Sequence, residues 1–431
     1  MAEPLVLKDF TVIDGTGRAP MPAAHVVIEQ GVIASVGGES TRLGDATVIE
    51  GRGRWLLPGL WDTHMHHVFS AGGFVWHEEF SAQQRLWNWR AYLRSGVTSV
   101  VSVGDDKNII LAARAAERDG TLVAPRIFAS GSMFTAPGGH PVGTILHGEV
   151  SRFRDIAVEV GDPAQGRHAL RRLVENDDVD LIKVVYSSIP GDVPRLGRDT
   201  LEALVAEAHA LQRRVFAHVS TTEEAAVCIA AGVDGLEHMV IADGQALDNV
   251  LATAADAGVF WTPTLCLFDK MAHDGDERYI EDYRPEGSVS HTILRSLQDP
   301  AARWRKPDPC AVAPRWARTV EFAGRAHAAG VRLPRGTDAG NPAVFHGLAV
   351  HRELELLVRA GLTPIDALAT ATTLAAAKVG ADARLGTVEP GKEADLVVVT
   401  ASPLADIRNT RQIELVIKRG QLFDPAALTV P

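Results

Sequence analysis

Two histidines separated by one residue close an apolar segment near the N-terminus. Residues 55–66 are predicted to form a strand that ends in Asp62-Thr63-His64-Met65-His66. Side chains at positions i and i+2 of a strand share a face, so His64 and His66 are expected to point together into the interior. Two neighbouring imidazoles can bind one divalent metal ion. The pair alone is a weak signal, because 16 histidines in 431 residues produce this spacing by chance about once in two such chains.

A lysine lies inside a second apolar strand, Leu181-Ile182-Lys183-Val184-Val185. Burying an ammonium group is costly unless it becomes neutral or finds a partner. One interpretation is a lysine at the edge of the strand whose ammonium group reaches solvent. The other is a desolvated amine with a lowered pKa, which could add CO2 and become a carbamate that bridges two metal ions.

Three more side chains with metal-binding chemistry end predicted strands: His218, His238 and Asp338. Each alone has an ordinary explanation, since a lone buried histidine is more often a hydrogen-bonded core residue and an aspartate after a strand is more often a helix N-cap. Their joint placement favours a site. The six candidates end the first, fourth, fifth, sixth and eighth predicted strands, so we predict that they meet at one metal centre.

Strand and helix patterns alternate through the middle of the chain. The strands are predicted at residues 55–66, 97–103, 126–130, 181–187, 214–219, 233–239, 259–265 and 331–338. Between most of them lie Ala- and Leu-rich helical stretches, such as 199–212 and 222–231, with acidic residues in the first turn. Eight βα units predict right-handed crossovers and an α/β fold with a closed (β/α)8 TIM-type barrel, whose chemistry lies at the C-terminal ends of the strands.

Both ends of the chain are rich in strand and turn patterns. Residues 25–36 predict a hairpin about Gln30-Gly31, and residues 393–400 and 413–418 are β-rich. The sequence therefore predicts three parts, namely the N-terminal part of a small β-sandwich at 1–58, the metal-dependent barrel at 59–380, and the C-terminal part of the sandwich at 381–431.

Composition excludes several classes of protein. The chain has 43 basic and 54 acidic residues, a net charge of −11, so binding of nucleic acid through a basic face is not expected. Three widely spaced cysteines argue against a disulfide scaffold. We expect no membrane partner, because no apolar run reaches the roughly 18 residues of a membrane span. No signal peptide is expected from the first residues, which favours a cytoplasmic location; a homo-oligomer is compatible with the sequence.

The ordered motifs resemble the amidohydrolase superfamily, in particular the subtype whose two metal ions are bridged by a carboxylated lysine, with dipeptidase, prolidase-like and imidazolonepropionase-like members. The resemblance covers nearly the whole chain: LLPGLWDTHMH, the lysine of the fourth strand, FAH, LEH, GTDAG and the tail GTVEPGKEADLVVV. The tail is similar to the segment that returns to join the N-terminal strands in a β-sandwich.

The resemblance assigns a role to each candidate. His64, His66 and Asp338 would hold the more buried metal ion, and His218 and His238 the more exposed one. Lys183, as a CO2-derived carbamate, would bridge two divalent ions, most simply zinc. A metal-bridging hydroxide would attack the substrate, and Asp338 would accept its proton and pass it to the leaving nitrogen as general base and acid.

The expected reaction is hydrolysis of a C–N bond of the amide type in a small molecule, a dipeptide or an N-acyl amino acid. His140 lies in a Gly-Gly-His loop that resembles the one in peptide- and amide-cleaving members, where it could donate to the developing oxyanion; the alternative is a surface loop with an incidental histidine. Tyr186 could hold the scissile carbonyl, although strict alternation points it away from the barrel axis and a packing role is equally open. Asn341 and His346 could line the pocket.

Two segments, 132–168 and 267–316, lengthen the barrel beyond the roughly 250 residues of a plain one and are expected at its C-terminal face. We interpret 267–316 as a lid. Its basic side chains could bind a substrate carboxylate, and its tryptophan could contact an apolar group of the substrate. These residues are Arg295, Arg303, Trp304, Arg305 and Lys306.

Three alternatives stay open. One is hydrolysis of a cyclic amide, an ester or a lactone. A second is deamination, which the presence of Lys183 and the non-acidic Thr221 disfavour, because the one-metal deaminases lack the lysine and carry an acid at that position. The third is a non-catalytic scaffold, which all six ligands argue against. A nicotinamide-dependent enzyme is disfavoured, since no G-x-G-x-x-G follows a strand.

Overall fold

The computed structural model describes residues 4–38, 46–68, 82–146, 155–188, 192–240, 242, 244–273, 277–298 and 309–431, of which residues 277 and 309–316 are described by their backbone alone. Arg303, Trp304, Arg305 and Lys306 of the predicted lid therefore lie outside the described residues. No helix among the described residues has both the length and the apolar character needed to cross a membrane.

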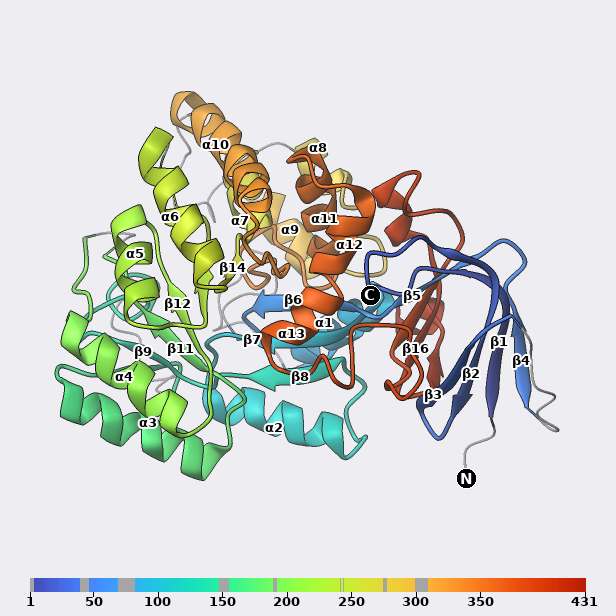
Figure 1. Cartoon of the computed structure of the whole chain (residues 1–431), viewed down its shortest axis with the longest axis horizontal. Coiled ribbons are helices and arrows are strands. Elements are labelled where there is room, and N and C mark those ends of the chain that lie inside the picture. Colours follow the sequence, from blue (N-terminus) through green and yellow to red (C-terminus); the bar gives the residue numbers. More distant parts are fainter. Residues whose placement is uncertain are drawn as a thin grey trace.

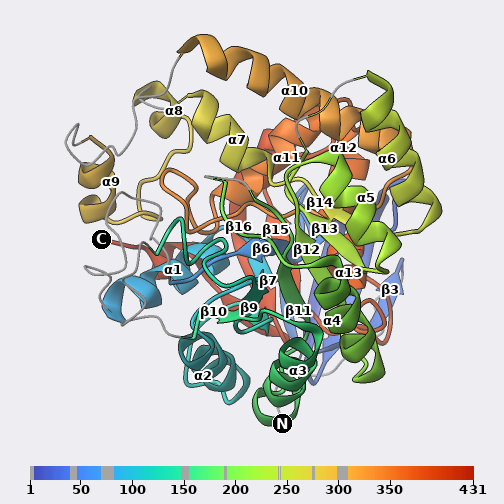
Figure 2. The same ribbon diagram turned by 90° about the vertical axis from the view of Figure 1, so that its left-hand side faces the viewer.

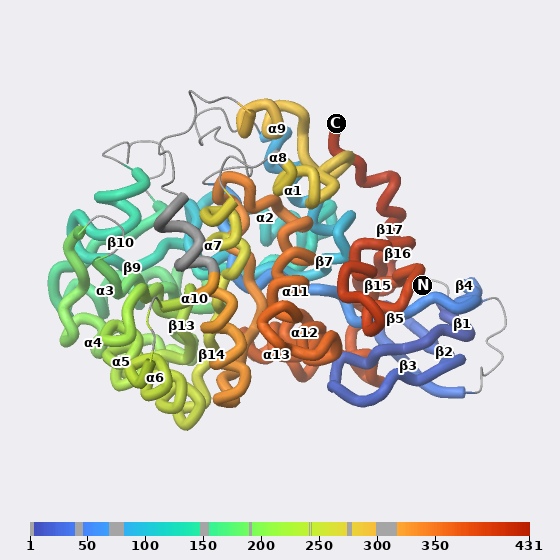
Figure 3. The backbone as a smooth tube through the Cα atoms, turned by 90° about the horizontal axis from the view of Figure 1, so that it is seen from above, coloured from blue at the N-terminus to red at the C-terminus, as the bar shows by residue number. Residues whose placement is uncertain are grey.

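Both ends of the chain contribute to one eight-stranded sheet. Its order is β17-β16-β15-β5-β1-β2-β3, with β4 paired to β1. The strands are β1 (Leu5–Val12), β2 (Met21–Glu29), β3 (Val32–Gly37), β4 (Thr47–Glu50), β5 (Trp55–Pro58), β15 (Leu396–Val399), β16 (Ile413–Lys418) and β17 (Gln421–Phe423). Figure 1 shows this sheet at one end of the molecule, and the view from above again places it opposite α3–α6 (Figure 3).

The predicted hairpin about Gln30-Gly31 is present, since β2 pairs antiparallel with β3. Both turn residues have positive φ, 52° for Gln30 and 80° for Gly31. Such turns match the twist of the two strands they join. The strands from the two ends of the chain are joined where β15 pairs antiparallel with β5. In this pairing Leu396 lies opposite Pro58.

The middle of the chain supplies parallel strands in two sheets, β6-β7-β8 and β10-β9-β11-β12-β13-β14. Their bounds are β6 (Leu60–Met65), β7 (Val97–Ser102), β8 (Arg126–Ala129), β9 (Met133–Thr135), β10 (Ala157–Glu159), β11 (Ile182–Val185), β12 (Val215–His218), β13 (Gly235–Glu237) and β14 (Phe260–Thr262). Seven of the eight predicted strand regions contain an observed strand. Segment 132–168 is only partly an excursion, because it contributes β9 and β10.

Helices surround these strands (Figure 2). They are α1 (Ala82–Arg94), α2 (Lys107–Arg118), α3 (Pro163–Asp177), α4 (Arg198–Ala210), α5 (Thr222–Ala230), α6 (Gly244–Asp256), α7 (Leu265–Ala272), α8 (Glu277–Glu281), α9 (His291–Gln298), α10 (Pro309–Ala328), α11 (Ala349–Arg359), α12 (Pro364–Thr370) and α13 (Thr373–Lys378), with 3-10 turns η3 (Ile407–Arg411) and η4 (Pro425–Leu428). Thr221 begins α5 through a capping box with Glu224, which satisfies backbone N–H groups that the first turn leaves open.

Two predicted strands differ from the structure. The region 55–66 forms two strands that are divided at Gly59. The first, β5, joins the terminal sheet, and the second, β6, joins the parallel strands. The chain passes so close to Thr98 at this point that a Cβ on Gly59 would lie 2.0 Å from Thr98 Oγ1. The region 331–338 is not a regular strand. Pro334 has no N–H to donate, and a Cβ on Gly336 would lie 2.5 Å from the Cβ of His64.

The segment 331–338 nevertheless contacts a strand on each side. The Trp261 N–H donates to Arg332 O at 2.8 Å, and the Thr63 N–H donates to Arg335 O at 3.0 Å. It therefore bridges β14 and β6, and it delivers Asp338 to the C-terminal end of β6.

The described part of segment 267–316 is packed against the body of the protein. Tyr283, Ile293 and Leu297 are buried in the same apolar cluster as residues of α1 and α11. The Ser290 hydroxyl donates to Gln84 Oε1 of α1 at 2.8 Å. Arg295 is exposed on α9.

Candidate metal centre

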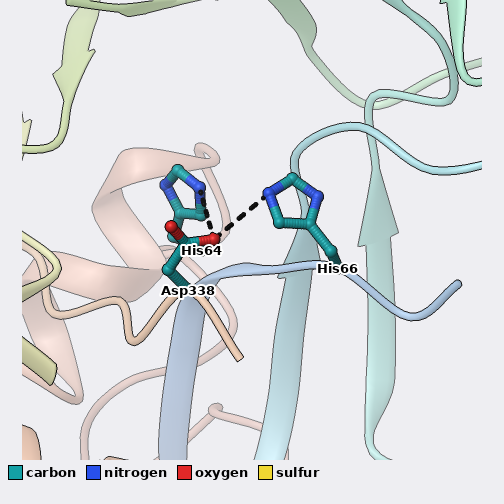
Figure 4. Close-up of side chains that lie close together, drawn as sticks. All are labelled: His64, His66 and Asp338. Atoms are coloured by element: carbon teal, nitrogen blue, oxygen red, sulfur yellow. Dashed lines mark ion pairs between the residues drawn. The ribbon is translucent and has the colours of Figure 1, made fainter. Parts of the chain in front are cut away.

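Three predicted ligands meet where β6 ends. The Nε2 atom of His66 lies 3.3 Å, and that of His64 3.6 Å, from Asp338 Oδ1. One ligand atom from each of the three residues falls within 4.8 Å of the others. Figure 4 shows the two rings and the carboxylate turned toward one another. Imidazole nitrogens and a carboxylate are the donor set that zinc binds in catalytic sites.

The rings of His238 and His218 continue this group. The ring centroid of His238 lies 4.6 Å from that of His64 and 4.4 Å from that of His218. Lys183, on β11 beside β12, is 2% exposed, and its charge lowers the pKa values of His64, His218, His238 and Asp338. The structure thus brings His64, His66 and Asp338 together, places the rings of His238 and His218 next to them, and buries Lys183 where its charge acts on the group.

Three of these side chains carry buried atoms that call for a partner. The Nε2 atom of His64, the Nζ atom of Lys183 and the Oδ1 atom of Asp338 have no hydrogen-bond partner among the described residues. Buried polar atoms are nearly always satisfied by protein, water or an ion. Imidazole nitrogens and a carboxylate that lie within 4.8 Å of one another fit a metal ion, and we conclude that the residues present suit a metal centre.

Burial shifts the titration of two candidate ligands toward the forms that bind metal or CO2, whereas for His66 the hydrogen bond and charge of Asp338 outweigh burial and raise the pKa. Burial lowers the pKa of His64 to about 4, helped by the charge of Lys183 and opposed by Glu237 and Asp338. Burial also lowers the pKa of Lys183 to about 8, although the Glu237 carboxylate opposes this. Imidazoles bind metals in their neutral form, and an amine needs its free lone pair to add CO2.

Backbone strain marks two of the ligands. His238 has φ of 70° and Asp338 has φ of 60°, both in the left-handed region. Such conformations are rare outside glycine and cluster at functional sites. The Asp338 N–H donates to His64 O at 2.8 Å, which fixes the carboxylate beside β6.

Three of the four candidate imidazoles have a defined hydrogen-bond partner on Nδ1, although Nδ1 of His238 also lies 3.7 Å from Asp338 Oδ2. The Nδ1 partners are Glu237 Oε2 for His64 at 2.6 Å, Gly104 O for His66 at 2.7 Å and Thr264 Oγ1 for His238 at 3.0 Å. A carbonyl or a carboxylate only accepts, so His66 and His64 donate from Nδ1 and keep the lone pair of Nε2 for a metal.

Sequence reasoning missed two supporting acids. Glu237 stands directly before His238 in a buried strand. An acidic residue inside a predicted buried strand was the sequence signal that could have identified it. Asp62 accepts from the Thr337 hydroxyl at 2.6 Å, the Thr337 N–H at 3.0 Å and the Tyr92 hydroxyl at 3.2 Å. It thereby ties β6 to the segment that carries Asp338.

His140 lies beside the centre. Its ring centroid is 5.1 Å from that of His218, and its Nδ1 is 2.6 Å from Thr144 Oγ1. Burial lowers its pKa to about 4. The preceding Gly139 is required by space, since a Cβ there would lie 2.5 Å from Thr135 Oγ1.

The other residues predicted to line the pocket are Tyr186, Asn341 and His346, and each contacts another part of the protein. The ring of Tyr186 contacts the Arg195 guanidinium, 4.7 Å from its centroid, and belongs to the apolar cluster under α4 and α5. These contacts support the packing alternative. Asn341 donates from Nδ2 to Asp338 O at 3.0 Å, and Nε2 of the buried His346 lies 3.1 Å from His66 O.

Comparisons with known proteins agree with this architecture. The ochratoxinase of Aspergillus niger is 27% identical over 96% of this chain and 85% of its own length. The imidazolonepropionase of Geobacillus thermodenitrificans is 24% identical over 98% of this chain and 93% of its own. A prolidase solved in complex with N-methylphosphonate-L-proline is 26% identical, with a TM-score of 0.79 over 98% of this chain and 99% of that one.

Structural likeness of this extent shows a TIM-barrel-like α/β fold. The sequence profile of the amidohydrolase family matches residues 55–423, which include all six candidate ligands. The chain therefore belongs to the amidohydrolase family and is a hydrolase that acts on C–N bonds.

Proposed function

We propose that this chain is a metal-dependent hydrolase that cleaves the C–N bond of a dipeptide or an N-acyl amino acid. The observation that carries the proposal is the grouping of His64, His66 and Asp338, which the rings of His238 and His218 adjoin. The likeness to a prolidase whose solved complex holds an L-proline derivative supports an amino acid as part of the substrate.

In the proposed centre, His64, His66 and Asp338 would hold one divalent ion, and His218 and His238 would hold the other. Lys183, as a carbamate, would be shared by both; its burial and its unpaired Nζ among the described residues support this role. Bound ions, most simply zinc, would supply polarisation of the substrate carbonyl and a lowered pKa of water.

The protein's own side chains orient the substrate and move the proton. Asp338 accepts a proton from the attacking water and delivers it to the leaving nitrogen, as its place between two imidazoles allows. His140 donates from Nε2 to the carbonyl oxygen. The Thr144 hydroxyl selects that tautomer by donating to Nδ1 at 2.6 Å, in preference to Pro141 O at 3.4 Å. For Tyr186 we propose the packing role.

The finer architecture is also our proposal. The hydrogen bonds of segment 331–338 on both sides support closure of the parallel strands into a barrel. The change from β5 in the terminal sheet to β6 in the parallel strands at Gly59 supports a boundary between parts 1–58 and 59–380. The terminal sheet contains strands from both ends of the chain, which supports a β-sandwich formed by parts 1–58 and 381–431.

A screen of dipeptides and N-acyl amino acids against zinc- and manganese-loaded protein tests the proposed substrate class. The expected result is the release of a free amino acid, which is detected by its newly exposed amine. Ammonia as the product would instead indicate deamination, and ring opening of a cyclic amide or lactone would support that alternative. Failure of every acyclic amide would overturn the substrate class. The capping role of Thr221, rather than a catalytic acid at that position, counts against deamination.

Replacement of His140 by alanine is expected to lower kcat about 10²–10³-fold, because one donor to the developing oxyanion is lost. Metal content should stay at the wild-type level, since His140 is outside the proposed ligand set. Steady-state kinetics and elemental analysis measure the two quantities. His209→Ala is a matched control, because His209 pairs with Asp234 on the surface. An unchanged kcat in His140→Ala would contradict the role.

A further inference from the structure

A second buried lysine, Lys378, lies behind the metal centre. It is the last residue of α13, and its side chain is fully buried. Its Nζ donates to Glu237 Oε1 at 2.7 Å, Thr262 Oγ1 at 2.8 Å and Thr63 O at 3.0 Å. An ammonium group has three donors, so all three are used, and they reach β13, β14 and β6.

Both oxygens of Glu237 are engaged as well. Oε1 accepts from Lys378, and Oε2 lies 2.6 Å from Nδ1 of His64. Because the carboxylate accepts, the proton is on Nδ1 of His64. The Nε2 lone pair then faces Asp338.

We propose that Lys378 and Glu237 form a positioning relay for His64, in which Lys378 holds the carboxylate and the carboxylate holds the imidazole tautomer and ring orientation that a metal ligand needs. The inference rests on the proposed function in that it places a metal ion at His64. A hydrogen bond from the second nitrogen of a metal-binding histidine typically strengthens metal affinity 10–100-fold.

A purely structural ion pair is the competing explanation. Such a pair would stabilise the junction of α13 with three strands, and its loss would lower stability without changing the metal affinity of the folded protein. The contact of Glu237 Oε2 with a ligand ring favours the relay, because an ion pair alone does not require it. The experiment must therefore measure metal affinity separately from stability.

Lys378→Met removes the ammonium group and keeps most of the side-chain volume. We expect the folded variant to bind zinc about 10–100-fold more weakly in a chelator competition, and its cobalt-loaded form to show a changed visible spectrum. Lys418→Met is the matched control. Lys418 is also a buried lysine paired with a glutamate, Glu117, and it contacts Ala124 O at 2.7 Å, away from the ligands. Wild-type zinc affinity in Lys378→Met would overturn the relay.

Glu237→Gln keeps the shape of the side chain and decides the question if Lys378→Met does not fold. Its single amide oxygen cannot serve both Lys378 and His64, so the same loss of zinc affinity is expected. The double variant Lys378→Met/Glu237→Gln removes both charges of this pair, and its amide oxygen is free to accept from His64. It should bind zinc more tightly than Lys378→Met alone, and no recovery would overturn the relay.

The outcomes separate the relay from the proposed function. A wild-type protein that binds zinc but hydrolyses no tested amide would refute the substrate class and leave the relay intact. Variants that bind zinc as tightly as an active wild-type protein would refute the relay and leave the substrate class intact.

Discussion

The Lys183→Ala variant is expected to bind about one metal ion per chain in place of two and to lose most turnover. Lys183 is 2% exposed, and no described group hydrogen-bonds to its Nζ. In the proposed centre, Nζ as a free amine would attack the carbon of CO2, so that an N–C bond forms, one C=O π bond opens onto oxygen and one N–H proton is released. Alanine cannot form this carbamate, so the ion that His218 and His238 would hold would lose an anionic ligand. Elemental analysis of the folded variant and its kcat test the prediction.

Labelling tests the carbamate directly. Wild-type protein prepared with ¹³C-bicarbonate should show a carbamate carbon by NMR that Lys183→Ala lacks. Lys107→Ala is a suitable control, because Lys107 forms a salt bridge of 2.7 Å with Asp177 outside the site. Full metal content and full activity in Lys183→Ala would refute the bridge.

The Asp338→Asn variant is expected to lose about 10²–10⁴-fold in kcat, the usual contribution of a positioned proton-transfer group. The amide keeps an oxygen that can face His64 and His66, but it cannot accept a proton from water at neutral pH. The loss should therefore appear mainly in kcat and less in KM. Initial-rate kinetics on zinc-loaded protein, with bound zinc measured on the same samples, check this.

A surface aspartate provides the control for that variant. Asp178 lies at the end of α3 and pairs with Arg213 at 3.0 Å, and its φ of 45° is one that asparagine also adopts. Asp178→Asn should leave kcat unchanged. A zinc-loaded Asp338→Asn variant with near wild-type kcat would show that another group moves the proton.

The strand ends could be predicted because their signals are local. Val215–His218 is an apolar run that ends in a histidine, and Gly235–Glu237 ends in a glutamate directly before His238; parallel strands carry functional groups at such C-terminal ends. Family and enzyme class, which followed from these motifs in order, are confirmed by the family profile.

The eighth region shows where a local pattern was insufficient. Its apolar residues suggested a strand, but Pro334 and Gly336 interrupt the ladder so that the chain can pass close to His64. For Tyr186, by contrast, strict alternation along the strand already pointed the ring away from the barrel axis. Its place in the apolar cluster and its contact with Arg195 agree with that direction.

The sequence by itself determined the candidates for the metal centre, because each was chosen by its residue type and by its position at the end of a predicted strand. Only the tertiary structure decided how those ligands are held. Lys378 meets Glu237 across 141 residues of chain and Thr63 across 315, and no local pattern encodes such pairs. They exist because burial leaves an ammonium group no water, so it must take its hydrogen bonds from whichever acceptors the packed strands present.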